Sequence, residues 1–97
     1  MDNKKMPSEL EIMKMSLFMK VMADSTRVKI LFAIKGKPKS VTKIQDLVGA
    51  TQSAVSHQLS LMRRFNIVDT KRDGNKIYYS LVDSGIEKVL DIVKKHV

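Results

Sequence analysis

Residues 51–64, TQSAVSHQLSLMRR, constrain this chain more than any other stretch, because they predict a helix with two unlike faces. At 3.6 residues per turn, Val55, Leu59 and Met62 fall on one apolar stripe. The opposite face is small, polar and basic and carries no acidic residue. A short apolar run at 44–48 comes before it, and two short helices broken at a small residue predict a helix-turn-helix, whose second helix enters the DNA major groove. For this segment alone, the alternative is a surface helix with a solvated polar face.

After residue 64 the hydrophobic pattern changes from that of a helix to that of strands. Two short segments, 66–72 and 76–81, flank the turn signal Asp73-Gly74-Asn75. A hairpin directly behind a recognition helix predicts a wing. Three cations lie near its tip: Lys71, Arg72 and Lys76. They could reach phosphates or the minor groove, although lysines on exposed hairpins also serve solubility and edge protection.

The first helix is expected over residues 8–22, because Ser8 and Glu11 form a capping-box pattern. It has two apolar stripes and therefore needs two surfaces to pack on. We expect the first stripe to pack on the chain's own core: Leu10, Met13, Leu17 and Val21. We expect the second to pack on another subunit: Ile12, Met15, Met19 and Met22. A membrane-surface helix is the rival, but the polar face is not rich in lysine.

The remaining elements complete the plan. A helix over about residues 25–35 is expected to bury four apolar side chains: Val28, Ile30, Leu31 and Ile34. Residues 40–41 are expected to pair briefly as a strand, and Thr42 with Gln45 suggests a capping box for the next helix. The last helix, over residues 83–97, has Asp83 as its N-cap and one broad apolar face.

The predicted fold is therefore mainly α with a two-stranded β-wing. It is a winged helix-turn-helix with an extra helix at each end. We expect a disordered tail over residues 1–7 and one domain over residues 8–97.

Composition limits the possible functions. A net charge of +8 points to a polyanionic partner, nucleic acid or an anionic membrane surface. The absence of cysteine excludes disulfides and thiolate metal sites. No apolar run approaches the roughly 20 residues of a spanning helix, and no signal core follows the N-terminal lysines. We expect a cytoplasmic protein without membrane association.

The chain resembles the ArsR/SmtB family of small dimeric bacterial repressors. The resemblance rests on residues 22–27 (MADSTR), 52–59 (QSAVSHQL) and 71–81 (KRDGNKIYYSL), and it covers roughly residues 10–97. It implies a homodimer whose interface is formed by the first and last helices. The interface residues expected on this basis are Ile12, Met15, Met19, Met22, Val89, Ile92 and Val93.

The resemblance also implies which residues meet double-stranded DNA. Those expected at the major groove are Gln52, Ser53, Ser56, His57 and Ser60, with Gln58 at the edge of that face. Those expected at phosphates are Arg63, Arg64, Lys71, Arg72 and Lys76. Short hydroxyls allow close approach, while Gln and His can bond base edges. For His57, a structural role or a phosphate contact stays open.

A metal site is not expected. Many members of the family bind metal through cysteines on the first half of the helix-turn-helix, and this chain has none. A second known site, on the last helix, takes an Asp-x-His pair from one subunit and a His-x-x-His or His-x-x-Glu pair from the other. Asp83 and His96 stand at matching positions, but Gly85 replaces the first His and the sequence ends at Val97, before the fourth ligand. Two ligands fall short of a tetrahedral zinc site. An N-cap and the helix dipole explain the two residues.

Three classes of function can be compared with the features of the sequence. The favoured one is a homodimeric repressor on a pseudo-palindromic operator with half-sites about 10 base pairs apart. The alternative is a winged-helix module that binds a protein, although such a module has no need of an acid-free recognition face. An enzyme is not expected, because no catalytic constellation is present. The sequence indicates no cofactor and names no effector.

Overall fold

The computed structural model describes residues 5–97 and has the expected winged helix-turn-helix with an extra helix at each end. The helices are α1 (Glu9–Met22), α2 (Ser25–Ile34), α3 (Val41–Val48), α4 (Gln52–Arg64) and α5 (Ser84–His96). The strands are β1 (Lys39–Ser40), β2 (Val68–Asp73) and β3 (Lys76–Leu81). Of the tail expected over residues 1–7, residues 1–4 lie outside the described residues. Residues 5–7 are exposed and belong to no helix or strand.

Side-chain caps fix where most helices begin. The capping box of α1 is confirmed: Glu11 N donates to Ser8 Oγ at 3.1 Å, and Ser8 N donates to Glu11 Oε1 at 2.9 Å. Thr51 caps α4, and Asp83 caps α5, as expected for Asp83. The capping box expected at Thr42 is wrong. The α3 N-cap is Ser40, whose Oγ accepts from Lys43 N at 3.3 Å, because the extended backbone of β1 leads straight into the helix.

The expected two-stranded wing is confirmed as the hairpin of β2 and β3, and the short strand β1 adds a third strand to the same sheet. The order is β1-β3-β2, and both pairings are antiparallel. The brief strand expected at residues 40–41 is Lys39–Ser40, since Val41 already begins α3. It pairs Lys39 with Tyr79 and thereby fastens the segment between α2 and α3 to the wing. The tight turn at the other end of β3 has Gly74 at φ 65°.

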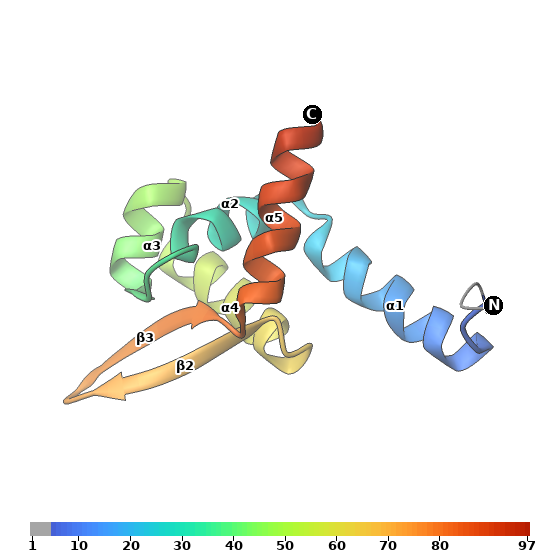
Figure 1. Ribbon diagram of the computed structural model, residues 1–97. Coiled ribbons are helices and arrows are strands. Elements are labelled where there is room, and N and C mark those ends of the chain that lie inside the picture. The colour runs from blue at the N-terminus through green and yellow to red at the C-terminus, as the bar shows by residue number, and fades with distance from the viewer. Residues whose placement is uncertain (1–4) are drawn as a thin grey trace.

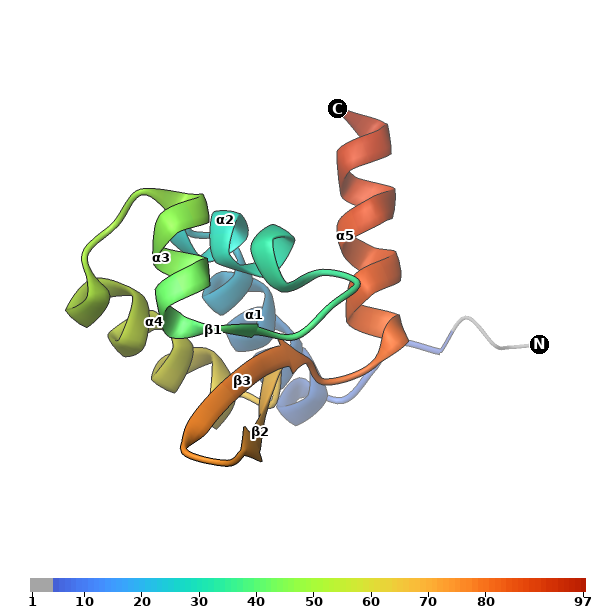
Figure 2. The same cartoon turned by 90° about the vertical axis from the view of Figure 1, so that its left-hand side faces the viewer.

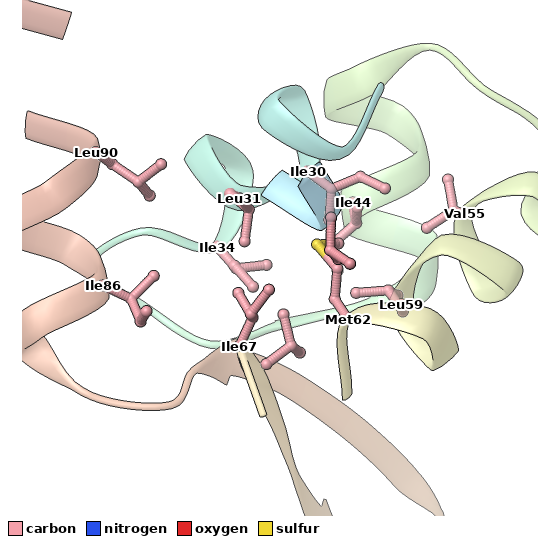
Figure 3. Close-up of a cluster of buried hydrophobic side chains, with 12 residues drawn as sticks. Ile30, Leu31, Ile34, Ile44, Val55, Leu59, Met62, Ile67, Ile86 and Leu90 are labelled. Carbon is pink, nitrogen blue, oxygen red and sulfur yellow. The ribbon is translucent and has the colours of Figure 1, made fainter. Parts of the chain in front are cut away.

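The core lies between the helix-turn-helix, α2 and the bases of the wing and α5 (Figure 3). The predicted stripe of α4 is confirmed, because Val55, Leu59 and Met62 are all fully buried. The full set of buried apolar side chains is Val21, Ile30, Leu31, Ile34, Ile44, Val55, Leu59, Met62, Ile67, Val68, Ile86 and Leu90. Each large member contributes about 1.5–3 kcal/mol to folding, and together they fix the rotation of α4 about its axis.

The first helix departs from expectation. Figure 1 shows α1 projecting from the body on the side away from the wing tip, while α5 rises from the middle. Leu10, Met13 and Leu17, expected in the core, are 57%, 53% and 44% exposed, and Val28 on α2 is also exposed. The reason is that only the C-terminal end of α1 packs on α2 and α4, where Val21 is buried. Both apolar stripes of α1 are therefore largely uncovered within one chain.

Among the described residues, none of the helices combines the length and the apolar character needed to cross a membrane.

Candidate nucleic-acid interface

The turn between α3 and α4 orients the recognition helix. Gly49 ends α3 in the left-handed region at φ 72°, and its N–H donates to Gln45 O at 2.9 Å. Two residues later Thr51 Oγ1 accepts from Ala54 N at 3.2 Å and starts α4. The chain thus reverses direction over three residues. The fully buried stripe of α4 faces the core, and its other face is left toward solvent.

That outer face holds most of the residues predicted to meet DNA bases. Six predicted residues are exposed: Gln52, Ser53, His57, Ser60, Arg63 and Arg64. Ser56 is half-buried beside them. No acidic residue lies on α4. The surface offers hydroxyl, amide and imidazole groups toward the first half of the helix and two guanidinium groups at its end, which is a suitable order for base edges and then phosphates.

Gln58 differs from its neighbours on α4. It is half-buried, and its Oε1 accepts a hydrogen bond from Arg27 Nη1 on α2 at 2.7 Å. A carbonyl that accepts from a guanidinium inside the protein is engaged before any DNA arrives. Gln58 was predicted at the edge of the DNA face, and the structure places its oxygen against α2 instead.

The wing carries the second group of predicted residues. Lys71, Arg72 and Lys76 are all exposed on β2 and β3. The hairpin projects away from the body (Figure 1), and Arg72 pairs across it with Ile77. The cations therefore sit on an arm that extends beyond the core, where a flanking stretch of duplex could be reached.

A cleft of about 580 Å³ brings the two groups together. It lies between the beginnings of α3 and α4 and the wing, with Gln52 on one side and Lys76 on the other. Thr42 and Lys43 of α3 also line it, and sequence reasoning missed both. Sequence reasoning could have included these two residues, because the first helix of a helix-turn-helix crosses the DNA backbone.

A second hollow, of about 480 Å³, adds another cation that sequence reasoning missed. Lys37 and Pro38 line it together with Lys71 and Arg72 of the wing. Lys37 reaches the wing because β1 pairs with β3, and a two-residue strand is too short to reveal its partner by periodicity. At the far end of α4, Ser60, Arg63 and Arg64 line a third hollow.

The weak metal candidates are far apart within one chain. Asp83 precedes α5 and His96 ends it, which separates them by the length of a 13-residue helix. Asp83 Oδ1 accepts from Ile86 N at 3.0 Å, as a cap does. Within residues 5–97, no three His, Cys, Asp or Glu side chains gather so as to hold a metal ion.

Sequence comparison finds relatives among bacterial regulators. The family described as "Bacterial regulatory protein, arsR family" matches residues 24–70, from the N-cap of α2 into β2. The regulator NmtR of Mycobacterium tuberculosis is 37% identical over 73 residues, which are 75% of this chain and 61% of NmtR. The regulator Rv0081 of the same species is 33% identical over 79 residues, which are 80% of this chain and 69% of Rv0081. The chain spans about three fifths of the length of the first curated relatives that it matches.

Solved structures have the same fold. NolR from Sinorhizobium fredii matches with a TM-score of 0.82 at 31% identity over 94% of both chains. The crystal structure of Rv0081 matches with a TM-score of 0.81 at 31% identity, covering 92% of this chain and 89% of that one. These matches include the helix-turn-helix, the wing and both outer helices. The chain therefore belongs to the ArsR family of bacterial regulatory proteins.

Proposed function

We propose that the protein is a sequence-specific DNA-binding transcriptional repressor that acts as a homodimer. One observation carries the proposal. The exposed face of α4 is polar and free of acid, and a cleft lined by Gln52, Lys43, Lys76 and one acidic residue, Asp46, connects it to a wing that exposes Lys71, Arg72 and Lys76. A surface that combines base-bonding groups with flanking cations suits a duplex, and the net charge of +8 favours it.

The proposed contacts divide by chemistry. The residues proposed to bond base edges are Gln52, Ser53, Ser56, His57 and Ser60. The residues proposed to bind phosphates are Arg63, Arg64, Lys71, Arg72 and Lys76, and the two clefts add Lys37 and Lys43. Base contacts determine which DNA sequence is bound, whereas phosphate contacts determine the position of the protein on the duplex and its overall affinity.

The homodimer is proposed from the uncovered apolar side chains of α1 and α5. Met19 is 59% exposed and Ile92 is 66% exposed, and Met15, Val89 and Val93 are also exposed. Figure 2 shows α5 standing apart from α3 and α4, so a partner seated on α1 and α5 leaves the recognition helix free. A two-fold dimer of this kind presents two recognition helices to half-sites about 10 base pairs apart.

In this proposal, repression results when the dimer occupies DNA at a promoter. A dimer bound over a promoter excludes the polymerase, and a ligand or partner that changes the dimer geometry changes the affinity for DNA, typically by about 1–3 kcal/mol. The site is one of binding, and no catalytic step is proposed. A regulator of bacterial transcription works where the chromosome lies, in the cytoplasm.

The test is selection from a library of random-sequence duplexes by the purified protein. We expect enrichment of an inverted repeat with half-sites about 10 base pairs apart. A library that gains no common sequence after repeated rounds would overturn the proposal of specific recognition.

The dimer is tested by Met19→Glu, which places a charge in the uncovered stripe of α1. Light scattering after gel filtration should give a dimer for the wild type and a monomer for the variant. The matched control is Lys29→Glu on α2, outside both outer helices, which should remain dimeric. A dimeric Met19→Glu would place the interface elsewhere.

A further inference from the structure

Polar links between helices are scarce in this protein, and they all start from α2. Among residues 5–97, every side-chain hydrogen bond or ion pair between different helices has as its donor either Arg27 of α2 or Lys35, the C-cap of α2. Lys35 reaches α5, while Arg27 reaches both α1 and α4.

Arg27 holds three segments together. Its Nε donates to the carbonyl oxygen of Val21 in the last turn of α1, and its Nη1 donates to Gln58 Oε1 in the middle of α4 at 2.7 Å. Its own backbone N–H donates to the N-cap Asp24 at 3.1 Å. The carbonyls of a last helical turn lack partners within the helix, so the Val21 oxygen is free to accept. A planar guanidinium can serve two such acceptors in fixed directions, whereas an ammonium cannot.

Gln58 lies at a position on α4 where its bond to Arg27 can affect the orientation of the recognition helix. It directly follows His57 and lies between the buried stripe and the outer face of α4, where its oxygen faces α2. The buried stripe limits the rotation of α4 about its axis, and the 2.7 Å charge-assisted bond adds a directional contact to α2 at mid-helix. The other end of the link is the one part of α1 that packs on the body, next to the stripes proposed to form the dimer.

We propose that Arg27 is a positioning residue for DNA recognition, which ties the base-reading helix α4, through Gln58, to the end of the dimer helix α1. The proposal rests on the proposed function. It assigns Gln58 to this link and not to a base, and it assigns Arg27 a role in specificity without contact to DNA.

Two other roles for Arg27 make different predictions. As a phosphate contact, it would raise affinity for all duplexes and add about one unit per protomer, about two for the dimer, to the salt dependence of binding. As a purely structural bond, it would change the unfolding temperature and leave discrimination between duplexes unchanged. A positioning residue changes the ratio of affinities for a selected and a scrambled duplex.

The experiment is a double-mutant cycle with Arg27→Met and Gln58→Met, both of which keep the apolar stem and remove the polar bond. The probes are a duplex selected by the wild type from a random library and its scrambled counterpart. We expect each single variant to lose about tenfold in the affinity ratio, with unchanged affinity for the scramble, and the double variant to lose no more than either. If Arg27→Met does not fold, Arg27→Lys takes its place in the cycle with Gln58→Met, because the coupling between the two positions is what separates the link from a base contact by Gln58.

Two controls complete the design. Arg27→Lys keeps the positive charge but loses the planar guanidinium with its fixed N–H directions, so it should lose discrimination between the two duplexes as Arg27→Met does. Ile30→Val trims the buried core of the same helix and costs about 0.5–1.5 kcal/mol of stability, yet it should keep the ratio. If the losses in the affinity ratio add up in the double variant, Gln58 contacts a base independently of Arg27, and the proposal is overturned. A loss in Ile30→Val as large as in Arg27→Met would also overturn it. A wild type that does not distinguish the two duplexes would defeat the proposed function itself.

Discussion

At the scale of single residues, a lysine at the end of α2 fastens the last helix to the body. Lys35 Nζ lies 2.9 Å from Asp91 Oδ1 and 3.8 Å from Glu87 Oε2. The hydrogen bond to Asp91 raises the pKa of Lys35 above its ordinary value, the attraction of both carboxylates adds to this, and partial desolvation opposes it. Because both carboxylates are more than one-third exposed, water screens the pair and its contribution to stability is small.

This pair makes stability depend on pH in the alkaline range. A lysine whose pKa is higher in the folded state stabilises the fold below the unfolded pKa, and that contribution is lost as the pH rises through the folded pKa. We expect Lys35→Met to lower the unfolding temperature at pH 7 to 9 and to converge on the wild type as the pH rises through the raised pKa of Lys35. Lys29→Met on the same helix is the control, and it should differ little from the wild type at any pH. A difference for Lys35→Met that persists at high pH would mean that lost packing causes it.

The wing cations should act on all DNA alike. Arg72→Ala combined with Lys76→Ala should weaken binding to selected and scrambled duplexes by similar factors. It should also reduce the slope of log affinity against log salt by about four for the dimer, because each of its two protomers loses two phosphate contacts. Titration at several salt concentrations measures this, with Lys88→Ala on α5 as the control. An unchanged slope would remove both residues from the phosphate contacts.

Residues of the α4 face should act on sequence. Ser56→Glu places a bulky anion where a short hydroxyl allows close approach, so specific binding should be abolished while light scattering still finds a dimer. His57→Glu should behave in the same way. If these variants only shifted the salt slope, as the wing variants should, the division into base-reading and phosphate-binding residues would be wrong.

At the scale of elements, the turn between α3 and α4 depends on one backbone conformation. Gly49 has φ 72°, and no atom lies within 4 Å of the position that a Cβ would take. Gly49→Ala therefore adds strain without a clash, and it should lower the free energy of unfolding by about 1 kcal/mol. Gly49→Asn should cost less, because asparagine tolerates the left-handed region. Equal losses for the two variants, measured by urea denaturation, would show that another cause acts.

The elements also show what periodicity can and cannot predict. The face of α4 was predictable, because Val55, Leu59 and Met62 repeat at helical spacing and Thr51 marks the start. The bond between Arg27 and Gln58 was not, since the two residues are 31 positions apart and polar pairs have no periodic pattern. A brief strand was expected at residues 40–41, but its pairing with β3 was not predicted. A strand of two residues is too short to show alternation.

At the scale of the whole molecule, apolar helices extend from a small core. Periodicity identified the two stripes of α1, but it could not say what covers them. The structure leaves Leu10, Met13 and Leu17 exposed, together with Met15 and Met19 of the stripe assigned to a partner, while Ile12 and Met22 are half-buried. The wing tip and α1 project to opposite sides (Figure 1). This shape separates a surface suited to DNA from a surface suited to a second copy, and α2 joins the two through Arg27 and Lys35.

The central claim is sequence-specific binding of a duplex through α4, and fluorescence anisotropy tests it most directly. A labelled duplex selected from a random library and a scramble of the same composition would be titrated with protein at one fixed salt concentration. We predict binding to the selected duplex at least about a thousandfold tighter than to the scramble, with two protomers per duplex at saturation. Equal and weak binding to both duplexes would contradict the account.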